Sequence, residues 1–274
     1  MLVSLRSDIF LQAVEPPGAG FDIWFVHGFG ESGLSFHEAL SSPLAATHNL
    51  YIPDLPGFGV SPPDPDVRSI ASAADVLVSL VGKLSGAKPI AFVGHSLGAL
   101  VAMEATRRLG SQVALLVNVE GNLTDKDTYL SGLTSRYAPE ELYPVLTGHV
   151  ATFKDDRQAL LRYLASLRLA DPDTLWHLGK SGVEATWTTQ GAESFLALAC
   201  RRTYYWGGES LSPKSLNVLK AWPAEIGKRE FPGAGHWLMI TQTRQFYAAL
   251  AEDIAAAGLT PTKQTIAGIE AACP

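Results

Sequence analysis

Cysteine is scarce in this chain. Only two occur, Cys200 and Cys273, which are too few and too far apart for a Cys-x-x-Cys redox or zinc-binding pattern. No disulfide framework is expected from two such residues. Because a reducing compartment suits free thiols, we expect a cytoplasmic protein.

Long hydrophobic runs and basic clusters are lacking as well. The longest uninterrupted apolar runs contain a handful of residues, whereas a membrane-spanning helix needs about 20. Residues 1–18 have no basic region followed by a continuous apolar stretch, so we interpret them as mature protein rather than a signal peptide. A formal net charge of -6 would repel a phosphate backbone. We therefore expect neither a membrane span nor a nucleic-acid partner.

What is abundant is apolar sequence in short runs. Hydrophobic residues make up 47% and charged residues 18% of the 274 residues, a balance that fits a sheet buried on both faces. Buried strands are predicted at 21–27, 50–53, 89–94, 113–120 and 203–206. Helical periodicity predicts helices at 70–84 and 97–109 and within 237–257. This alternation predicts an α/β protein with a mostly parallel central sheet flanked by helices.

One segment breaks the alternation of strands and helices. Residues 122–195 have a mostly helical pattern, so we predict a helical cap insertion in a core domain made of residues 1–121 and 196–274. The aromatic residues of the insertion could line a pocket over the sheet, but we favour a role in holding the insertion together. These residues are Tyr129, Tyr137, Tyr143, Phe153, Tyr163, Trp176 and Trp187.

A candidate nucleophile lies between the predicted strand 89–94 and the helix 97–109. Residues 94–98 read Gly-His-Ser-Leu-Gly, the G-x-S-x-G pattern of a nucleophile elbow. Glycines are needed there because Ser96 must adopt a strained backbone and side chains at 94 and 98 would collide with the turn. The pattern therefore predicts a serine whose hydroxyl projects from the sheet.

Together with three further motifs, this elbow resembles the α/β-hydrolase family. Residues 27–30 (His-Gly-Phe-Gly) match the family's oxyanion loop, residues 54–61 (Asp-Leu-Pro-Gly-Phe-Gly-Val-Ser) match its Asp-x-Pro-Gly-x-Gly-x-Ser turn, and Gly235-His236 matches the late Gly-His that supplies the catalytic histidine. The resemblance implies a serine, acid and histidine triad. It also implies an oxyanion hole made by the backbone N–H groups of Phe29 and Leu97.

A serine hydroxyl needs a base, because it is a poor nucleophile at its own pKa. We predict that His236 takes the Ser96 proton during attack and returns it to the leaving group. Among the seven histidines, His236 alone is predicted on a loop between a strand and a terminal helix. His27 is expected to order the oxyanion loop, and His95 is fixed beside the elbow.

The acid departs from the family's commonest pattern. In that pattern the acid lies in the loop after the strand 203–206, and here Ser210 occupies its position. The neighbouring Glu209 is one candidate. Glu120 is the other, since it ends an apolar strand as the acid does in haloalkane dehalogenases and some lactone hydrolases. We favour Glu120, because a carboxylate buried there needs a partner and an imidazole N–H is a suitable one, whereas Glu209 lies among polar loop residues.

These residues predict a serine hydrolase that cleaves an ester, lactone or related acyl bond of a small molecule. Carbon–carbon bond hydrolysis and perhydrolysis use the same triad types and stay open. Chemistry with an aspartate nucleophile is disfavoured by Ser96. A receptor that keeps the triad on this fold is a further alternative. None of these functions needs a metal ion or cofactor, and we expect none.

Overall fold

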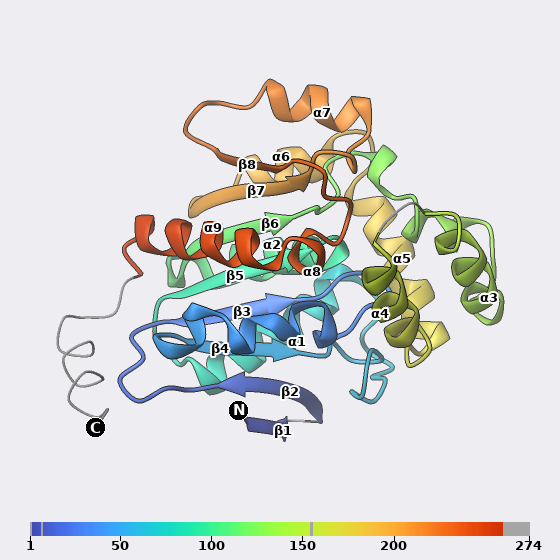
Figure 1. Cartoon of the computed structure of the whole chain (residues 1–274). Coiled ribbons are helices and arrows are strands. Elements are labelled where there is room, and N and C mark those ends of the chain that lie inside the picture. Colours follow the sequence, from blue (N-terminus) through green and yellow to red (C-terminus); the bar gives the residue numbers. More distant parts are fainter. Residues whose placement is uncertain (1, 7, 154–155, 260–274) are drawn as a thin grey trace.

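An eight-stranded sheet forms the centre of the protein (Figure 1). The computed structural model describes residues 2–6, 8–153 and 156–259. The strand order is β1-β2-β4-β3-β5-β6-β7-β8. The first two strands pair in antiparallel fashion, β2 is antiparallel to β4, and all later neighbours are parallel. The strands are β1 (Leu2–Arg6), β2 (Ile9–Val14), β3 (Asp22–Val26), β4 (Asn49–Pro53), β5 (Ile90–His95), β6 (Val113–Val119), β7 (Arg201–Gly207) and β8 (Gly227–Phe231).

Helices cover both faces of this sheet, which confirms the predicted fold class (Figure 1). Helix α1 packs on α2, and α8 and α9 contact the 3-10 helices η1 and η2 on the other side. The α-helices are α1 (Ile70–Leu84), α2 (Leu97–Leu109), α3 (Pro139–Val150), α4 (Arg157–Leu167), α5 (Pro172–Ala185), α6 (Gln190–Leu196), α7 (Pro213–Lys220), α8 (Leu238–Thr241) and α9 (Thr243–Ala256). The 3-10 helices are η1 (Gly33–Ser41), η2 (Pro43–Ala46), η3 (Gly110–Gln112), η4 (Asp125–Asp127) and η5 (Ser131–Ser135).

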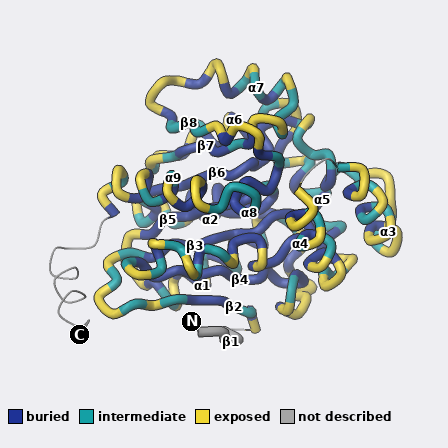
Figure 2. Tube along the Cα trace, viewed as in Figure 1, coloured by how far each residue is buried: buried dark blue, intermediate teal, exposed yellow. Residues whose placement is uncertain are grey.

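The five predicted strands correspond to β3 to β7, whereas β1, β2 and β8 were not among them. The sequence of β8, Gly-Lys-Arg-Glu-Phe, has no apolar run because this strand lies at the edge of the sheet and is mostly half-exposed. Central strands are different: β3, β4 and β5 are buried along their whole length (Figure 2). Apolar runs therefore reveal the middle of a parallel sheet better than its edges.

The segment between β6 and β7 contains η4, η5 and α3 to α6. Its helices α3, α4 and α5 lie beyond the carboxyl ends of the parallel strands (Figure 1). Helix α4 is tied to the segment that follows β3, since Arg162 binds both carboxylate oxygens of Glu38 in η1 at 2.7 Å and Ser166 Oγ lies 2.9 Å from Ser32 Oγ in the loop before η1. Ligands of open α/β sheets bind at this same end of the strands.

Within the described residues, every helix is too short or too polar to cross a membrane. Cys273 and residues 260–274 of the predicted core domain lie outside the described part of the chain. The apolar centre is formed by β3, β5 and β6 with the helices against them, including Trp24, Phe25 and Phe92, which are fully buried. A rigid apolar core of this kind fixes the positions of the loops at the ends of its strands.

Candidate active site

Ser96 lies at the sharp turn between β5 and α2. Its φ of 51° and ψ of -124° fall outside the helical and extended regions that non-glycine residues prefer. The Ser96 N–H donates to the Val119 carbonyl at 2.9 Å, which ties the turn to β6. Its side chain is half-buried, while both sequence neighbours are buried. Such a strained backbone at a reachable serine is the geometry of a nucleophile elbow.

The glycines that flank Ser96 are required by close backbone approaches. A Cβ on Gly94 would lie 2.6 Å from Ala99 Cα, and a Cβ on Gly98 would lie 2.2 Å from the His27 carbonyl oxygen. Both distances are shorter than van der Waals contact, and the obstructing atoms belong to the backbone. The G-x-S-x-G spacing therefore follows from the packing of α2 against the end of β3.

The loop after β3 passes directly beside the elbow. A Cβ on Gly28 would lie 3.0 Å from Ser96 Cβ, so only glycine fits without displacement. Within the described residues, the backbone N–H groups of Phe29 and Leu97 donate no hydrogen bond to the protein, although both residues are buried. Buried amides without partners are rare. These two N–H groups are available to a negatively charged oxygen beside Ser96.

His27 shapes this loop as a neutral imidazole. Its Nδ1 lies 3.0 Å from the Gly28 carbonyl, and its Nε2 accepts a hydrogen bond from the Leu55 N–H at 3.0 Å. One nitrogen donates and the other accepts, which is the pattern of the neutral ring. Burial agrees with this, because it lowers the pKa of His27 in spite of the Asp54 carboxylate nearby.

His236 and Glu120 meet at the end of the sheet. His236 lies in the turn before α8, and its Nδ1 is 3.3 Å from Glu120 Oε2. This distance is slightly longer than the 2.6–3.2 Å of a well-formed hydrogen bond. Both side chains are buried. The structure thus brings Glu120, which directly follows β6, to His236, which follows β8.

Ser210, at the position where the family usually has its acid, supports Glu120 instead. Its hydroxyl donates to Glu120 Oε1 at 2.5 Å, and the Gly207 N–H donates to the same oxygen at 2.5 Å. Burial raises the pKa of Glu120 to about 8, and these two hydrogen bonds oppose that shift. The carboxyl of Glu120, just after β6, is therefore held by donors from the end of β7 and the loop that follows it.

The rival candidate, Glu209, lies on the protein surface. Its side chain is exposed, and within the described residues its carboxylate makes no hydrogen bond or ion pair, while its backbone N–H donates to the Ala234 carbonyl at 3.3 Å. It does line a cavity beside His236. The geometry gives the imidazole of His236 a carboxylate neighbour in Glu120 and none in Glu209.

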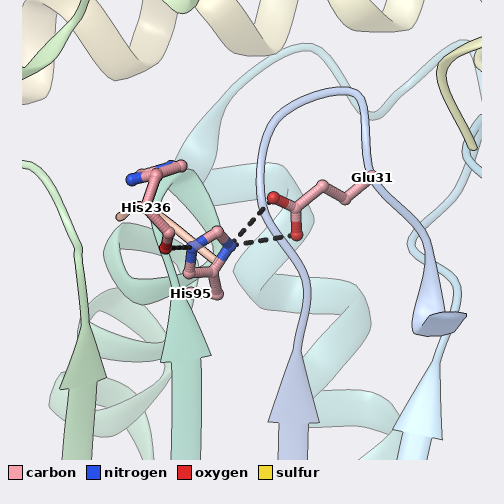
Figure 3. Close-up of side chains that lie close together, drawn as sticks. All are labelled: Glu31, His95 and His236. Atoms are coloured by element: carbon pink, nitrogen blue, oxygen red, sulfur yellow. Dashed lines mark hydrogen bonds and ion pairs between the residues drawn. The ribbon is translucent and has the colours of Figure 1, made fainter. Parts of the chain in front are cut away.

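A second buried carboxylate, Glu31, lies beside His95, on the side away from His236 (Figure 3). Its Oε1 and Oε2 lie 2.9 and 3.0 Å from His95 Nδ1, and the other ring nitrogen of His95 is 3.0 Å from the His236 carbonyl oxygen. Burial alone would raise the pKa of Glu31, but His95 and the Gly28 N–H lower it to about 2. The pKa of His95 is raised above its ordinary value by Glu31 against the effect of burial.

Glu31, His95 and His236 also form a cluster of three side chains with metal-ligating atoms, all within 4.8 Å of one another. The donor set does not fit a metal ion. Each Glu31 oxygen already accepts hydrogen bonds: Oε1 from Trp237 Nε1 at 2.8 Å, and Oε2 from the Gly28 N–H at 2.9 Å and Ser35 Oγ at 2.8 Å. With the His95 N–H added, its lone pairs are directed at protein donors.

Comparison with known proteins decides the family. A family model described as "Alpha/beta hydrolase family" matches residues 25–250, most of the chain. The chain belongs to the α/β-hydrolase family. This confirms the resemblance drawn from the elbow and the three further motifs.

Solved structures similar to this α/β hydrolase include those of a lactonase and an esterase. A structure of the N-acyl homoserine lactonase AidH with N-butanoyl homoserine is 18% identical, with a TM-score of 0.72 over 91% of this chain and 93% of that chain. A thermophilic esterase from Thermogutta terrifontis is 21% identical, with a TM-score of 0.72 over 91% of this chain and 94% of that one. At such identities the structures establish a shared fold.

A curated relative matches over a shorter stretch. The probable lysophospholipase BODYGUARD 3 from Arabidopsis thaliana is 31% identical over 114 residues, which are 39% of this chain. The match spans 23% of that protein, less than a quarter of its length.

A cavity of about 580 Å³ opens beside the base of this α/β hydrolase. Tyr129 and Phe153 from the segment between β6 and β7 line it together with Ser210 and His236. The Tyr129 ring also packs edge-on against His236, with 5.4 Å between ring centroids. At least these two aromatic residues of the segment therefore line a pocket, the interpretation that sequence analysis ranked second.

Sequence reasoning missed three polar residues near the site, namely Glu31, Ser210 as a partner of Glu120, and the hydroxyl of Tyr163. Tyr163 is buried, and its hydroxyl has no hydrogen-bond partner in the described structure. A Cβ on Gly30 would lie 2.8 Å from that hydroxyl, so α4 places it against the oxyanion loop. Contacts between segments so distant in sequence leave no local pattern to detect.

Proposed function

We propose that this α/β hydrolase cleaves an ester, lactone or related acyl bond of a small molecule through an acyl-enzyme at Ser96. The observation that carries the proposal is the strained, half-buried Ser96 beside two buried amides without protein partners, those of Phe29 and Leu97. A reachable hydroxyl next to donors for a developing oxyanion is the arrangement that acyl transfer requires.

In the proposed reaction, His236 removes the Ser96 proton as Oγ attacks the carbonyl carbon. The N–H groups of Phe29 and Leu97 bind the oxyanion of the tetrahedral intermediate. Collapse of the intermediate breaks the carbon–oxygen bond, and His236 gives its proton to the leaving alcohol. Water then attacks the acyl-enzyme by the same steps in reverse. Glu120 accepts the Nδ1 hydrogen bond of His236 and stabilises its cationic form.

We assign residues 122–195 as the cap that binds the substrate. In support, α5 packs on both oxyanion residues: a Cβ on Gly179 would lie 2.8 Å from Phe29 Cε2, and one on Gly182 would lie 3.0 Å from Leu97 Cδ1. The lactone and ester chemistry named for the similar structures supports the substrate class. The cap supplies apolar walls, and Tyr163 adds one O–H donor at the oxyanion loop.

Ser96→Ala tests this function directly. The variant should lose turnover of p-nitrophenyl esters by about 10³-fold or more and lose labelling by a fluorophosphonate, since triad members act as a unit. The exposed Ser111, far from the elbow in sequence, provides the control Ser111→Ala, which should behave like the parent.

Different outcomes separate the alternatives. Retained esterase activity in Ser96→Ala would remove the serine from the mechanism. Covalent labelling at Ser96 without steady-state product release would indicate a receptor. Ser96-dependent cleavage of a carbon–carbon bond or formation of a peracid, faster than ester hydrolysis, would replace the proposed reaction with one of the related chemistries.

A further inference from the structure

Glu31 joins three loops of the site through one carboxylate. It accepts hydrogen bonds from the Gly28 N–H in the oxyanion loop, from His95 beside the nucleophile, and from Trp237 Nε1 beside the base. Ser35 Oγ adds a further donor at 2.8 Å. The Glu31 side chain is almost completely buried. A carboxylate surrounded by four donors from separate segments fixes their relative positions.

His95 extends the connection to the base itself. Its Nδ1 faces the Glu31 carboxylate and its Nε2 faces the backbone carbonyl of His236 at 3.0 Å (Figure 3). Both neighbours are acceptors, so both ring nitrogens must donate and the imidazole must be doubly protonated. His27 shows the opposite pattern, with one nitrogen donating and one accepting.

We propose that the Glu31–His95 ion pair fixes the relative positions of the oxyanion loop, the nucleophile and the base, and that His95 in this pair is a permanent imidazolium. The proposal rests on the function proposed above. Stability alone does not account for the pair, because a buried ion pair is often no more stable than apolar residues of the same volume. Here the pair connects the segments that bear Phe29, Ser96 and His236.

The charge of His95 also acts on the base. The rings of His95 and His236 lie with centroids 4.6 Å apart. The charged or titratable groups that act on His95 from the surrounding elements are Glu31, Glu120, His27 and His236. The His95 cation favours the neutral form of His236, whereas the Glu31 carboxylate of the same cluster favours the protonated form, so the two charges of the ion pair oppose each other at His236.

Nuclear magnetic resonance of the unaltered protein tests the protonation state. With ¹⁵N-labelled histidine, His95 should show two slowly exchanging ring N–H protons and imidazolium nitrogen shifts at pH 7 and 8. A single ring N–H on His95 at pH 7 would overturn the proposal. This measurement needs neither a variant nor a substrate.

Glu31→Gln tests the positioning role. The amide keeps the size of the side chain and can still accept from the Gly28 N–H, but it cannot hold His95 as a cation. We expect kcat to fall about 10- to 100-fold with KM within about two-fold, because small displacements of catalytic groups cost activity. The acid limb of the kcat/KM profile should stay within about half a unit of the parent, since the variant removes the negative charge of Glu31 together with the positive charge of His95, and both lie close to His236.

Asp253→Asn is the matched control. Asp253 is a second buried carboxylate in an ion pair, bound to Arg229 at 2.7 Å and Tyr205 Oη at 2.8 Å, on the terminal helix α9. It should lower thermal stability without changing kcat or the pH profile.

The activity of Glu31→Gln is interpreted together with that of Ser96→Ala, measured in parallel. If Ser96→Ala is inactive while Glu31→Gln keeps the kcat of the parent, the positioning role is wrong and the proposed function stands. If Ser96→Ala stays active, the proposed function fails, whereas the NMR result on His95 still decides its charge. A Glu31→Gln protein that does not fold leaves the NMR test of the parent decisive.

Discussion

Glu120 is a buried carboxyl, and its role in the proposed reaction requires that it be charged. Its Oε2 lies 3.3 Å from His236 Nδ1, and its other oxygen accepts from Ser210 and Gly207. Three donors aimed at one carboxyl favour the ionised form, whereas burial opposes it. At this residue, hydrogen bonding must offset desolvation for the triad to work.

We predict different effects on kcat for Glu120→Gln and Glu209→Gln. Glu120→Gln should lower kcat by about 10²- to 10⁴-fold, because an amide does not hold the imidazole in the productive tautomer. Glu209→Gln should stay close to the parent, since the side chain is exposed and, within the described residues, makes no hydrogen bond or ion pair with His236. Steady-state kinetics on one ester substrate compares them. A severe loss at Glu209 with a mild one at Glu120 would move the acid to the loop after β7.

At the scale of elements, helix α5 packs directly against Phe29 and Leu97. Its glycines at 179 and 182 face the side chains of Phe29 and Leu97, and at both positions any Cβ would be in tight contact. The two positions differ in what the new atom meets. At Gly182 the neighbour is the flexible end of Leu97, whereas at Gly179 it is the Phe29 ring together with Thr134.

Gly182→Ala should therefore fold normally and change substrate preference. The added methyl group pushes on Leu97 Cδ1, so we expect turnover of long-chain acyl esters to fall relative to short-chain esters by about 10-fold, the effect of a methylene-sized change in a pocket. Gly148→Ala in α3 is the control, because a Cβ there meets nothing within 4 Å. Equal kcat/KM ratios across chain lengths in both variants would show that α5 does not shape the acyl pocket.

The sequence predicted the elements of the core better than the contacts of the site. The strand and helix around Ser96 were evident because a buried apolar run, a strained turn and an amphipathic helix each leave a local pattern. The role of Ser210 could not be predicted from the sequence, because its partner Glu120 lies 90 residues away. Glu31 was missed for the same reason: its partner His95 is 64 residues distant and nothing around Glu31 marks a buried charge. Edge strands such as β8 were not found because exposure removes the apolar run.

For the molecule as a whole, activity and stability should respond to pH in opposite directions. Protonation of the Glu120–His236 pair removes the base, so activity is lost as pH falls. Because burial raises the pKa of Glu120 to about 8, we expect half-maximal kcat/KM above pH 6.5. The pKa of Glu120 is about 8 in the folded protein and has its ordinary value of 4.5 in the unfolded chain. Its contribution to the free energy of unfolding should therefore decrease as pH rises from 4.5 to about 8.

Thermal unfolding of the parent and Glu120→Gln between pH 5 and 8 checks the stability half of this prediction. The glutamine stays neutral, so the melting temperature of the parent minus that of the variant should decrease as pH rises. The difference isolates Glu120 from other titrating groups. A difference that is constant or increases over this range would mean that the pKa of Glu120 is not raised in the folded protein.

The backbone at Ser96 and Glu120 has a consequence for how this protein would change under selection. Both residues have positive φ angles, 51° and 55°, and they follow the neighbouring strands β5 and β6. Such conformations cost a non-glycine residue about 1–3 kcal/mol each, and glycine adopts them freely. A library screened only for heat resistance should therefore accumulate glycine at these two positions and lose the chemistry.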